Sequence, residues 1–447
     1  MKVQMFKYWE ALRSSFWFIP AMLVAGAVAL AAVAGRVDRL TVVEGWLAIG
    51  WSFTGGAEGA SAVLGIIAGS MATIAGVVFS MTLVTLSLAS SQLGPRLLRS
   101  FMRDPPTQIV LGTYVATFLY CVLVVLTIRR SDAYAFVPQL SVTLGVLLAV
   151  ISLGMLIYFI HHVAISIQAN QVIARVGSEL IDVLEGLFPE TIGQGPAGKS
   201  AEIPGAAFLR LLSREGEPVG ASGDGYLQFV DASALMALAV REDVVIRLEC
   251  RPGHYVVAGR PLLRVWPASQ RGDEFAREVN AAFALGNQRT PGQDIESAIN
   301  ELVEIAVRAL SSGINDPFTA IACVDRLGSA FCRLATREMP SPYRYDSKGQ
   351  LRVIAPSPSF PTMLDAGFDQ IRQHGRANVA VSIRLMDTLA LITAFAHRPA
   401  DRAALLRHAD MIRRGAWQSF AEHEDRDALE KRYRAVKQGL EAPLQDD

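Results

Sequence analysis

Side chains able to act as acids, bases, nucleophiles or metal ligands are scattered through this sequence. It contains no GxSxG, HExxH, Walker or GxGxxG pattern. Among its seven histidines, His408 with Asp410 is a conceivable ligand pair. That spacing arises readily on a polar helix, so we expect no metal site there. The sequence therefore predicts a protein that is not an enzyme and has no cofactor and no bound metal.

The polar run after the helix predicted for residues 295–310 has a structural explanation. Gly313 is the expected C-terminal cap residue of that helix. Pro317 suits the first turn of the next helix, with Asp316 as its N-cap. Asn315 and Asp316 are therefore interpreted as capping groups and not as catalytic ones.

Small and hydroxylated side chains recur on one face of the helix predicted within the charge-free run Gly59–Pro95. They are Gly65, Gly69, Thr73, Gly76, Ser80 and Ser87. The three hydroxyl residues are spaced by seven, and the first two glycines form a GxxxG pair, so the set shares one face. Two interpretations stay open: the helix packs centrally among its neighbours, or its hydroxyl face lines a water-filled path in an oligomer. Such a path without fixed charge fits a weakly selective pore gated by dewetting better than a proton-coupled pump.

Four stretches are long and apolar enough to cross a bilayer, which needs about 20 apolar residues. They are Phe16–Ala34, a part of Gly59–Pro95, Gln108–Ile128 and Phe136–Ile160, all free of Asp, Glu, Lys and Arg. The first is too long for a cleaved leader and is kept as a span. His161 and His162 follow the fourth span and are expected to mark the interface. The sequence thus predicts a multi-pass protein embedded in a lipid bilayer.

Basic residues indicate the orientation of these spans. Lys2, Lys7 and Arg13 precede the first span, and Arg96, Arg99 and Arg103 separate the second from the third. The opposing loops hold Arg36, Arg39, Arg129 and Arg130. Six basic residues against four favour both termini on the cytoplasmic side. The second group could also bind anionic lipid headgroups, although topology alone explains it.

Composition excludes several classes of protein. The chain has 42 basic and 42 acidic residues, so it has no global cationic field to attract nucleic acid. Apolar residues make up 51% and charged residues 19%, an average over two halves, because most charges follow Gln168. The cysteines are Cys121, Cys250, Cys323 and Cys332, and none forms a CxxC pair. We expect reduced thiols and neither a disulfide framework nor a zinc site.

After the last span the sequence predicts a helix over 164–186 and a linker over Pro189–Pro204. Short strand-like runs follow at 226–230 and 243–250, and Pro252-Gly253 begins a segment that resembles the hairpins of barrel-sandwich, lipoyl-type domains. Those domains attach their cofactor to a lysine, and no lysine lies between Lys199 and Lys348. The resemblance therefore concerns shape, and no covalent cofactor is expected.

The predicted architecture is α-helical in the membrane, followed by an α+β part. We divide the chain into four transmembrane helices at 1–165, a helical connector and linker at 166–218, a small barrel-sandwich-like β domain at 219–267 and a helical domain at 268–447. Within the last, apolar periodicity predicts helices over 295–310, 361–374, 378–397, 401–420 and 423–438.

Three segments resemble the signature of a bacterial family of predicted membrane proteins, domain of unknown function 2254. They are the run from Ala75 to Arg99, Asp294-Ile-Glu296, and the run from Ala309 to Pro317. The resemblance implies a bacterial inner-membrane setting and no settled activity, and it transfers no catalytic or binding residue.

Two functions fit these patterns. One is a homo-oligomeric channel or conduit whose C-terminal part forms a vestibule or gate. The alternative is a membrane-anchored scaffold or sensor whose cytoplasmic part binds a ligand or protein partner. The hydroxyl-bearing second span favours the first.

Topology provides the first test. Reporter fusions after Arg13 and at the C-terminus should both be active on the cytoplasmic side, because four spans return the chain to its starting side. A periplasmic signal from only one of the two fusions would mean that the number of spans is odd.

Overall fold

A computed structural model describes most of the chain. The described residues are 16–39, 55–94, 104–129, 136–166, 168–188, 204–268, 272–290 and 292–441. The chain forms two compact units that divide between Gln171 and Val172. Each unit is described by itself.

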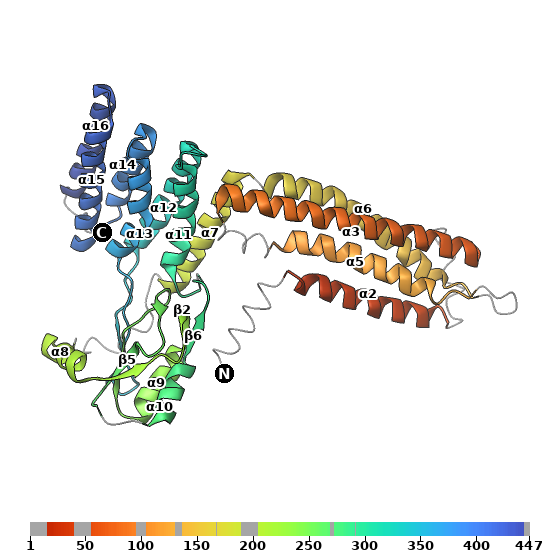
Figure 1. The fold of residues 1–447 in the computed structure, drawn as a ribbon, viewed down its shortest axis with the longest axis horizontal. Helices are drawn as coiled ribbons and strands as arrows, with labels where there is room; N and C mark the ends of the chain where they lie inside the picture. Colours follow the sequence, from red (N-terminus) through yellow and green to blue (C-terminus); the bar gives the residue numbers. More distant parts are fainter. Residues whose placement is uncertain are drawn as a thin grey trace. The chain divides into compact units, whose positions relative to one another are not determined.

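The N-terminal unit consists of four long apolar helices (Figure 1). They are α2 (Phe18–Val37), α3 (Ala57–Leu93), α5 (Pro105–Val125) and α6 (Gln139–Ser166). All four are long and apolar enough to cross a membrane. The four predicted spans are therefore confirmed as helices of spanning length.

The central helix of this unit is α5, which packs against the other three. In its most apolar window 56% of the residues are buried, against 22% for α3. Gly112 lets α2 approach, since a Cβ there would lie 2.7 Å from Leu23 Cδ1 and 2.9 Å from the Pro20 backbone. The interpretation that α3 packs centrally among its neighbours is thus wrong for the single chain.

Polar side chains inside the unit bond to neighbouring helices. The Tyr114 hydroxyl donates to the Ser152 carbonyl at 2.8 Å, and the Tyr120 hydroxyl donates to the Ser141 carbonyl at 2.9 Å. The hydroxyls of Thr117 and Ser152 lie 3.1 Å apart. Because an apolar surrounding offers no alternative partner, each of these bonds favours one register of α5 against α6.

The first turns of α5 and α6 are each bonded by an aspartate, Asp104 at α5 and Asp38 at α6. Asp38, just after α2, accepts from the Leu140 amide at 2.9 Å and from both the amide and hydroxyl of Ser141, at 3.0 and 2.6 Å. Asp104 is the N-cap of α5, and its Oδ2 lies 2.7 Å from His162 Nε2. Both carboxylates satisfy amides that a helix leaves free and favour the positive end of its dipole.

The C-terminal unit contains two small sheets. The five-stranded sheet has the order β1-β5-β3-β8-β7, with β3 and β8 parallel and the other neighbours antiparallel. Its strands are β1 (Glu217–Gly220), β3 (Val245–Leu248), β5 (Pro261–Trp266), β7 (Tyr343–Tyr345) and β8 (Leu351–Ile354). The three-stranded antiparallel sheet joins β4 (Tyr255–Val256), β2 (Gly225–Val230) and β6 (Phe283–Gly286).

This arrangement does not confirm the barrel-sandwich description of residues 219–267. No closed barrel forms among the described strands, and β6, β7 and β8 come from beyond Pro267. A helix, α9 (Ala232–Arg241), separates β2 from β3 and begins at its N-cap Asp231. The apolar core under the sheets also includes Phe275 and Val279 of α10 (Asp273–Ala281). Local turn chemistry predicted the hairpin, and distant strands determined the sheet.

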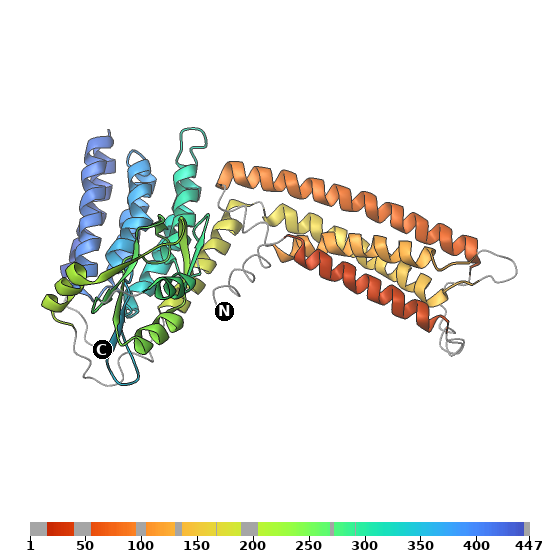
Figure 2. The ribbon, with the colours of Figure 1, turned by 60° about the horizontal axis from the view of Figure 1, so that its bottom comes forward.

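Six further helices form three hairpins stacked in two layers, seen side by side in Figures 1 and 2. They are α11 (Ile295–Ala309), α12 (Pro317–Thr336), α13 (Phe360–Gly375), α14 (Val379–Thr393), α15 (Pro399–Ser419) and α16 (His423–Glu441). One layer runs α11, α13, α15 and the other α12, α14, α16. These helices match the predicted ones closely, because their apolar residues follow the helical period.

Two local predictions need correction. The helix predicted over 164–186 is two helices, since α6 ends at Ser166 and α7 (Ala169–Leu187) begins three residues later, where the all-round apolar pattern becomes amphipathic. Gly313 is not the left-handed residue after α11, because Asn315 has that conformation with φ +49°. The Asp316 N-cap is confirmed, with its carboxylate accepting from the amides of Phe318 and Thr319. The linker over Pro189–Pro204 lies mostly outside the described residues, and α8 (Ala206–Glu215) follows it.

Replacing Asp38 tests the bond between α2 and α6. Asp38→Ala leaves two α6 amides and one hydroxyl without this acceptor, so we expect a loss of about 1–2 kcal/mol in the free energy of unfolding. The measurement is thermal unfolding in a single detergent. Asp38→Asn, which keeps one acceptor oxygen, should lose less. Equal melting temperatures for wild type and Asp38→Ala would contradict the proposed contact.

Candidate functional site

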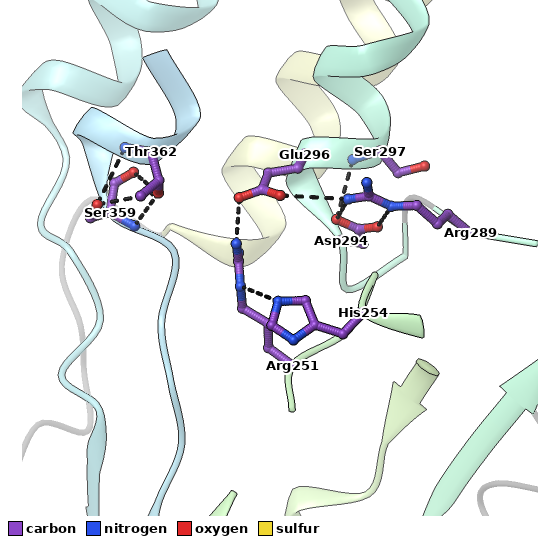
Figure 3. Close-up of polar contacts among 8 residues, drawn as sticks. All are labelled: Arg251, His254, Arg289, Asp294, Glu296, Ser297, Ser359 and Thr362. Atoms are coloured by element: carbon purple, nitrogen blue, oxygen red, sulfur yellow. Dashed lines mark hydrogen bonds and ion pairs between the residues drawn. The ribbon is translucent and has the colours of Figure 1, made fainter. Parts of the chain in front are cut away.

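A cluster of charged residues surrounds the first turn of α11 in the C-terminal unit (Figure 3). Asp294 is the N-cap of that helix, and its side chain is only 2% exposed. It accepts a hydrogen bond from the Ser297 amide at 3.2 Å. A carboxylate this deeply buried needs compensation, which its surroundings provide.

The compensation comes from Arg289, in the segment that precedes α11. Its Nε and Nη2 donate to the two carboxylate oxygens of Asp294 at 2.6 and 2.8 Å. This two-pronged geometry is the strongest arrangement of an arginine and a carboxylate. The bond to Asp294 raises the pKa of the Arg289 guanidinium above its ordinary value. The Arg289 guanidinium therefore stays charged throughout the physiological range.

A second arginine extends the cluster to the hairpin that joins β3 to β5, whose long loop (249–260) contains β4 of the three-stranded sheet. Arg251 Nη2 donates to Glu296 Oε1 at 2.5 Å, and Arg251 Nε donates to His254 Nε2 at 3.2 Å. The other oxygen of Glu296 lies 3.6 Å from Arg289. Partial burial and the neighbouring Arg251 cation lower the pKa of His254. Its imidazole is thus neutral at pH 7, as an acceptor of the Arg251 bond must be.

Gly253 lets the hairpin come close to α11. Its φ of +93° disfavours any side chain, and a Cβ there would lie 2.3 Å from Asp294 Oδ2. Gln293 fastens the same region, because its side chain accepts from the Val230 amide at 3.0 Å and donates to the Val230 carbonyl at 3.4 Å. The hairpin and the start of α11 are therefore in direct contact.

We name Arg251, His254, Arg289, Asp294 and Glu296 the charged joint. Two arginines balance two carboxylates, and the histidine is neutral, so the joint carries no net charge. It presents no activated nucleophile, and the described residues contain no group of three or more His, Cys, Asp or Glu able to hold a metal ion. It connects the three-stranded sheet to the first turn of α11 through ion pairs and hydrogen bonds.

The residues predicted as a site lie elsewhere. Gly65, Gly69, Thr73, Gly76, Ser80 and Ser87 are all exposed on α3 in the single chain. Arg96, Arg99 and Arg103 lie outside the described residues. Whether the first set lines a path or packs on a partner, and whether the second contacts lipid, stay predictions.

His408 and Asp410 point to different partners. His408 is fully buried with its Nε2 2.8 Å from Asp365, and burial lowers the pKa of its imidazole. Asp410 accepts from the Tyr433 hydroxyl at 2.7 Å. The two side chains therefore do not form a metal-binding pair.

A groove of about 610 Å³ lies between α12 and α14. Arg384 and Asp325 form a two-pronged ion pair on one side, at 2.5 and 2.7 Å, and Leu391 and Phe395 provide apolar surface. Burial raises the pKa of the Cys332 thiol in its wall to about 11, so this thiol is protonated and unreactive.

Sequence reasoning identified two parts of the charged joint for other reasons and missed their meeting. Pro252-Gly253 indicated a turn, and Asp294-Ile-Glu296 belonged to the family signature. Arg251 and Arg289 were not singled out. The available signal was an arginine five residues before a helix N-cap carboxylate, which is weak, because its partner hairpin lies about 40 residues earlier in the chain.

Four helices of spanning length, followed by a sheet-and-helix unit with a charged joint, define a multi-span membrane protein. The family model described as "Predicted membrane protein (DUF2254)" matches residues 13–391, and the chain belongs to this family. Uncharacterized proteins of Mycobacterium tuberculosis (strain H37Rv) and Mycobacterium bovis are each 33% identical over 422 residues, which cover 93% of this chain and 79% of theirs. No solved structure was found to match. The family resemblance stated from the sequence is confirmed.

Burial makes the charged joint sensitive to the loss of one partner. Asp294→Ala leaves the partly buried Arg289 without its two-pronged acceptor, and we expect a loss of about 2–4 kcal/mol in the free energy of unfolding. The matched control is Asp325→Ala, which breaks an Arg–Asp pair of the same geometry whose side chains are 45% and 40% exposed. That loss should stay below about 1 kcal/mol. Denaturant unfolding of both variants measures the difference. Equal losses of unfolding free energy would contradict the larger cost that we assign to the buried pair.

Proposed function

We propose that this protein is a subunit of a homo-oligomeric conduit in the bacterial inner membrane. In this proposal both termini are cytoplasmic, and the C-terminal unit forms a vestibule or gate. The observation that carries the proposal is the direction of the small and hydroxylated face of α3.

That face points away from the other helices of its own chain. A Cβ on Gly65, Gly69 or Gly76 would meet nothing within 4 Å. The opposite face of α3 carries the buried side chains, among them Leu64 and Val78. Glycines that serve close packing are filled by a neighbour, as Gly112 and Gly145 are in this same unit. The α3 glycines have no such neighbour among the residues that the structure describes.

A second copy of the chain would supply the missing neighbour. In lipid, helices associate through close van der Waals contact and hydrogen bonds, and small residues in a GxxxG pattern allow backbones to approach. A face of glycine and hydroxyl residues gains little from contact with lipid tails, whereas leucine or phenylalanine would fill that space better. The α3 face therefore supports association of identical subunits through this helix.

The hydroxyls on the same face support a hydrated path. The Thr73 hydroxyl donates to the Gly69 carbonyl at 3.0 Å and keeps its lone pairs free to accept from water. Ser80 and Ser87 are exposed on the same face. The window of α3 that could cross a membrane has two or fewer charged residues, so the path would be polar without being charged. Such a path would conduct when wetted and close by dewetting.

The charged joint gives the C-terminal unit a means to respond. It couples the sheet to the helical hairpins through ionic bonds, and a ligand that moved one part would strain the other. In the proposed assembly this is how a vestibule would pass a binding event on as a change of shape.

The groove between α12 and α14 favours a second candidate, an anchored scaffold or sensor. Its mixed lining of an ion pair and exposed apolar side chains, with Leu391 56% exposed, is typical of a surface that binds a peptide or small ligand. In that case the spans would only hold the binding unit at the membrane.

Cysteine crosslinking and flux separate these two functions. Thr73→Cys, Ser80→Cys and Ser87→Cys, each in a chain without native cysteines, should crosslink between subunits in reconstituted vesicles. Gly69→Leu should abolish crosslinking by blocking close approach. The matched control is Gly154→Leu on α6, whose glycine is also open in the single chain and whose replacement should leave crosslinking unchanged.

Flux of a small dye distinguishes conduction from association alone. Ser80→Leu should preserve crosslinking at position 73 and lower flux about tenfold or more, because a more hydrophobic path favours dewetting. Absence of crosslinks at all three positions would overturn the conduit. Crosslinks without any wild-type flux would support the anchored scaffold.

A further inference from the structure

The loop between α11 and α12, together with the first turn of α12, presents two large apolar side chains on a hydrogen-bonded backbone. Its turns are closed by bonds from the Asn315 amide to the Ser311 carbonyl at 2.8 Å and from the Asp316 amide to the Ala309 carbonyl at 2.7 Å. The Asp316 carboxylate is occupied as the N-cap of α12, where it also accepts from the Thr319 hydroxyl at 2.6 Å. The loop's shape is therefore fixed by its own hydrogen bonds.

Ile314 projects from this loop and Phe318 from the first turn of α12, and both side chains are exposed among the described residues. Ile314 is 43% exposed, and Phe318 is 80% exposed, the highest value for a large apolar side chain among the described residues. Neither is needed for the loop's hydrogen bonds through its side chain. Exposed large apolar side chains on a hydrogen-bonded backbone are typical of a surface that contacts an apolar partner.

The position of this loop follows from the packing of α7 on α12. A Cβ on Gly177 would lie 3.0 Å from the Arg326 side chain, Glu185 pairs with Arg333 at 3.1 Å, and the Phe188 carbonyl accepts from Arg337 at 2.7 Å. All three pairs are separated by 148 or 149 residues, so the two helices run parallel with a constant offset.

This offset puts the beginning of α7 at the level of the loop. When the offset is continued toward the start of both helices, residue 169, the first of α7, falls at the level of Phe318 in the first turn of α12. Only residues 167 and 168 separate α7 from α6, the last helix of spanning length.

We propose that Ile314 and Phe318 insert into the bilayer surface next to the last span. The end of the C-terminal unit that carries them is the end joined to the last span by two residues. Between Ala309 and Phe318 the only charge is that of Asp316, which is held by its capping bonds. Insertion at the level of the lipid headgroups would cover the two side chains without burying a free charge, as amphipathic anchors do. The contact would steady the C-terminal unit against the membrane and does not depend on the conduit.

Nitroxide depth measurements on the full chain in phosphatidylcholine vesicles test this proposal. A spin label is attached at Ile314→Cys, with Phe318 intact, and separately at Phe318→Cys, with Ile314 intact, in a chain without native cysteines. The control is Ser347→Cys, exposed in the turn between β7 and β8 beyond the far end of α12. Collisions with oxygen, which concentrates in lipid, are compared with collisions with the water-soluble chelate Ni(II)EDDA.

The labels at 314 and 318 should collide more with oxygen than with the nickel chelate, and the label at 347 should show the reverse order. Vesicles that contain anionic lipid should give the same result as the zwitterionic phosphatidylcholine vesicles, because the inserted pair is uncharged. Nickel collisions at 318 equal to those at 347 would show a water-exposed loop and overturn the proposal. Protection from both reagents would show a protein contact and overturn it equally.

Discussion

The absence of hydrogen-bond partners in hydrocarbon governs the N-terminal half of this protein. A segment that crosses a bilayer must satisfy its own backbone, so it becomes a helix, and its polar side chains must bond to a neighbouring helix or to their own backbone. Tyr114, Tyr120 and Thr117 do the first against α6, which places α5 at the centre. Thr73, Thr82 and Thr85 of α3 do the second, with each hydroxyl bonded to the carbonyl four residues before it. Helices of similar hydropathy therefore differ in their contacts: α5 packs against the other three helices, and α3 exposes one face in the single chain.

A different constraint operates in the C-terminal unit, where water is available and burial of charge is the costly event. Asp294 is almost fully buried, and its carboxylate is compensated by the two-pronged bond from Arg289 and by the Ser297 amide. Gly253 is the consequence on the facing hairpin, because the carboxylate occupies the space of its side chain. Together with Arg251 and Gln293, these three residues connect the three-stranded sheet to the start of α11.

The two constraints meet in the short connection after α6. Within three residues the chain passes from an all-round apolar helix to α7, whose apolar residues lie on one face and pack on α12.

The sequence by itself determined the four spans, the C-terminal helices, the Asp316 cap and the family, because hydrophobic length, helical period and capping chemistry are local properties. Only the tertiary structure decided which helix is central, since α3 and α5 are equally apolar and differ in the neighbours that fill their glycines. It also decided the sheets, because β6 and β8 lie far along the chain from their partners β2 and β3. The barrel-sandwich description of this region is not confirmed. The charged joint was beyond sequence reasoning for the same reason: Gly253 and Asp294 are explained by a contact between segments about 40 residues apart, which no local pattern records.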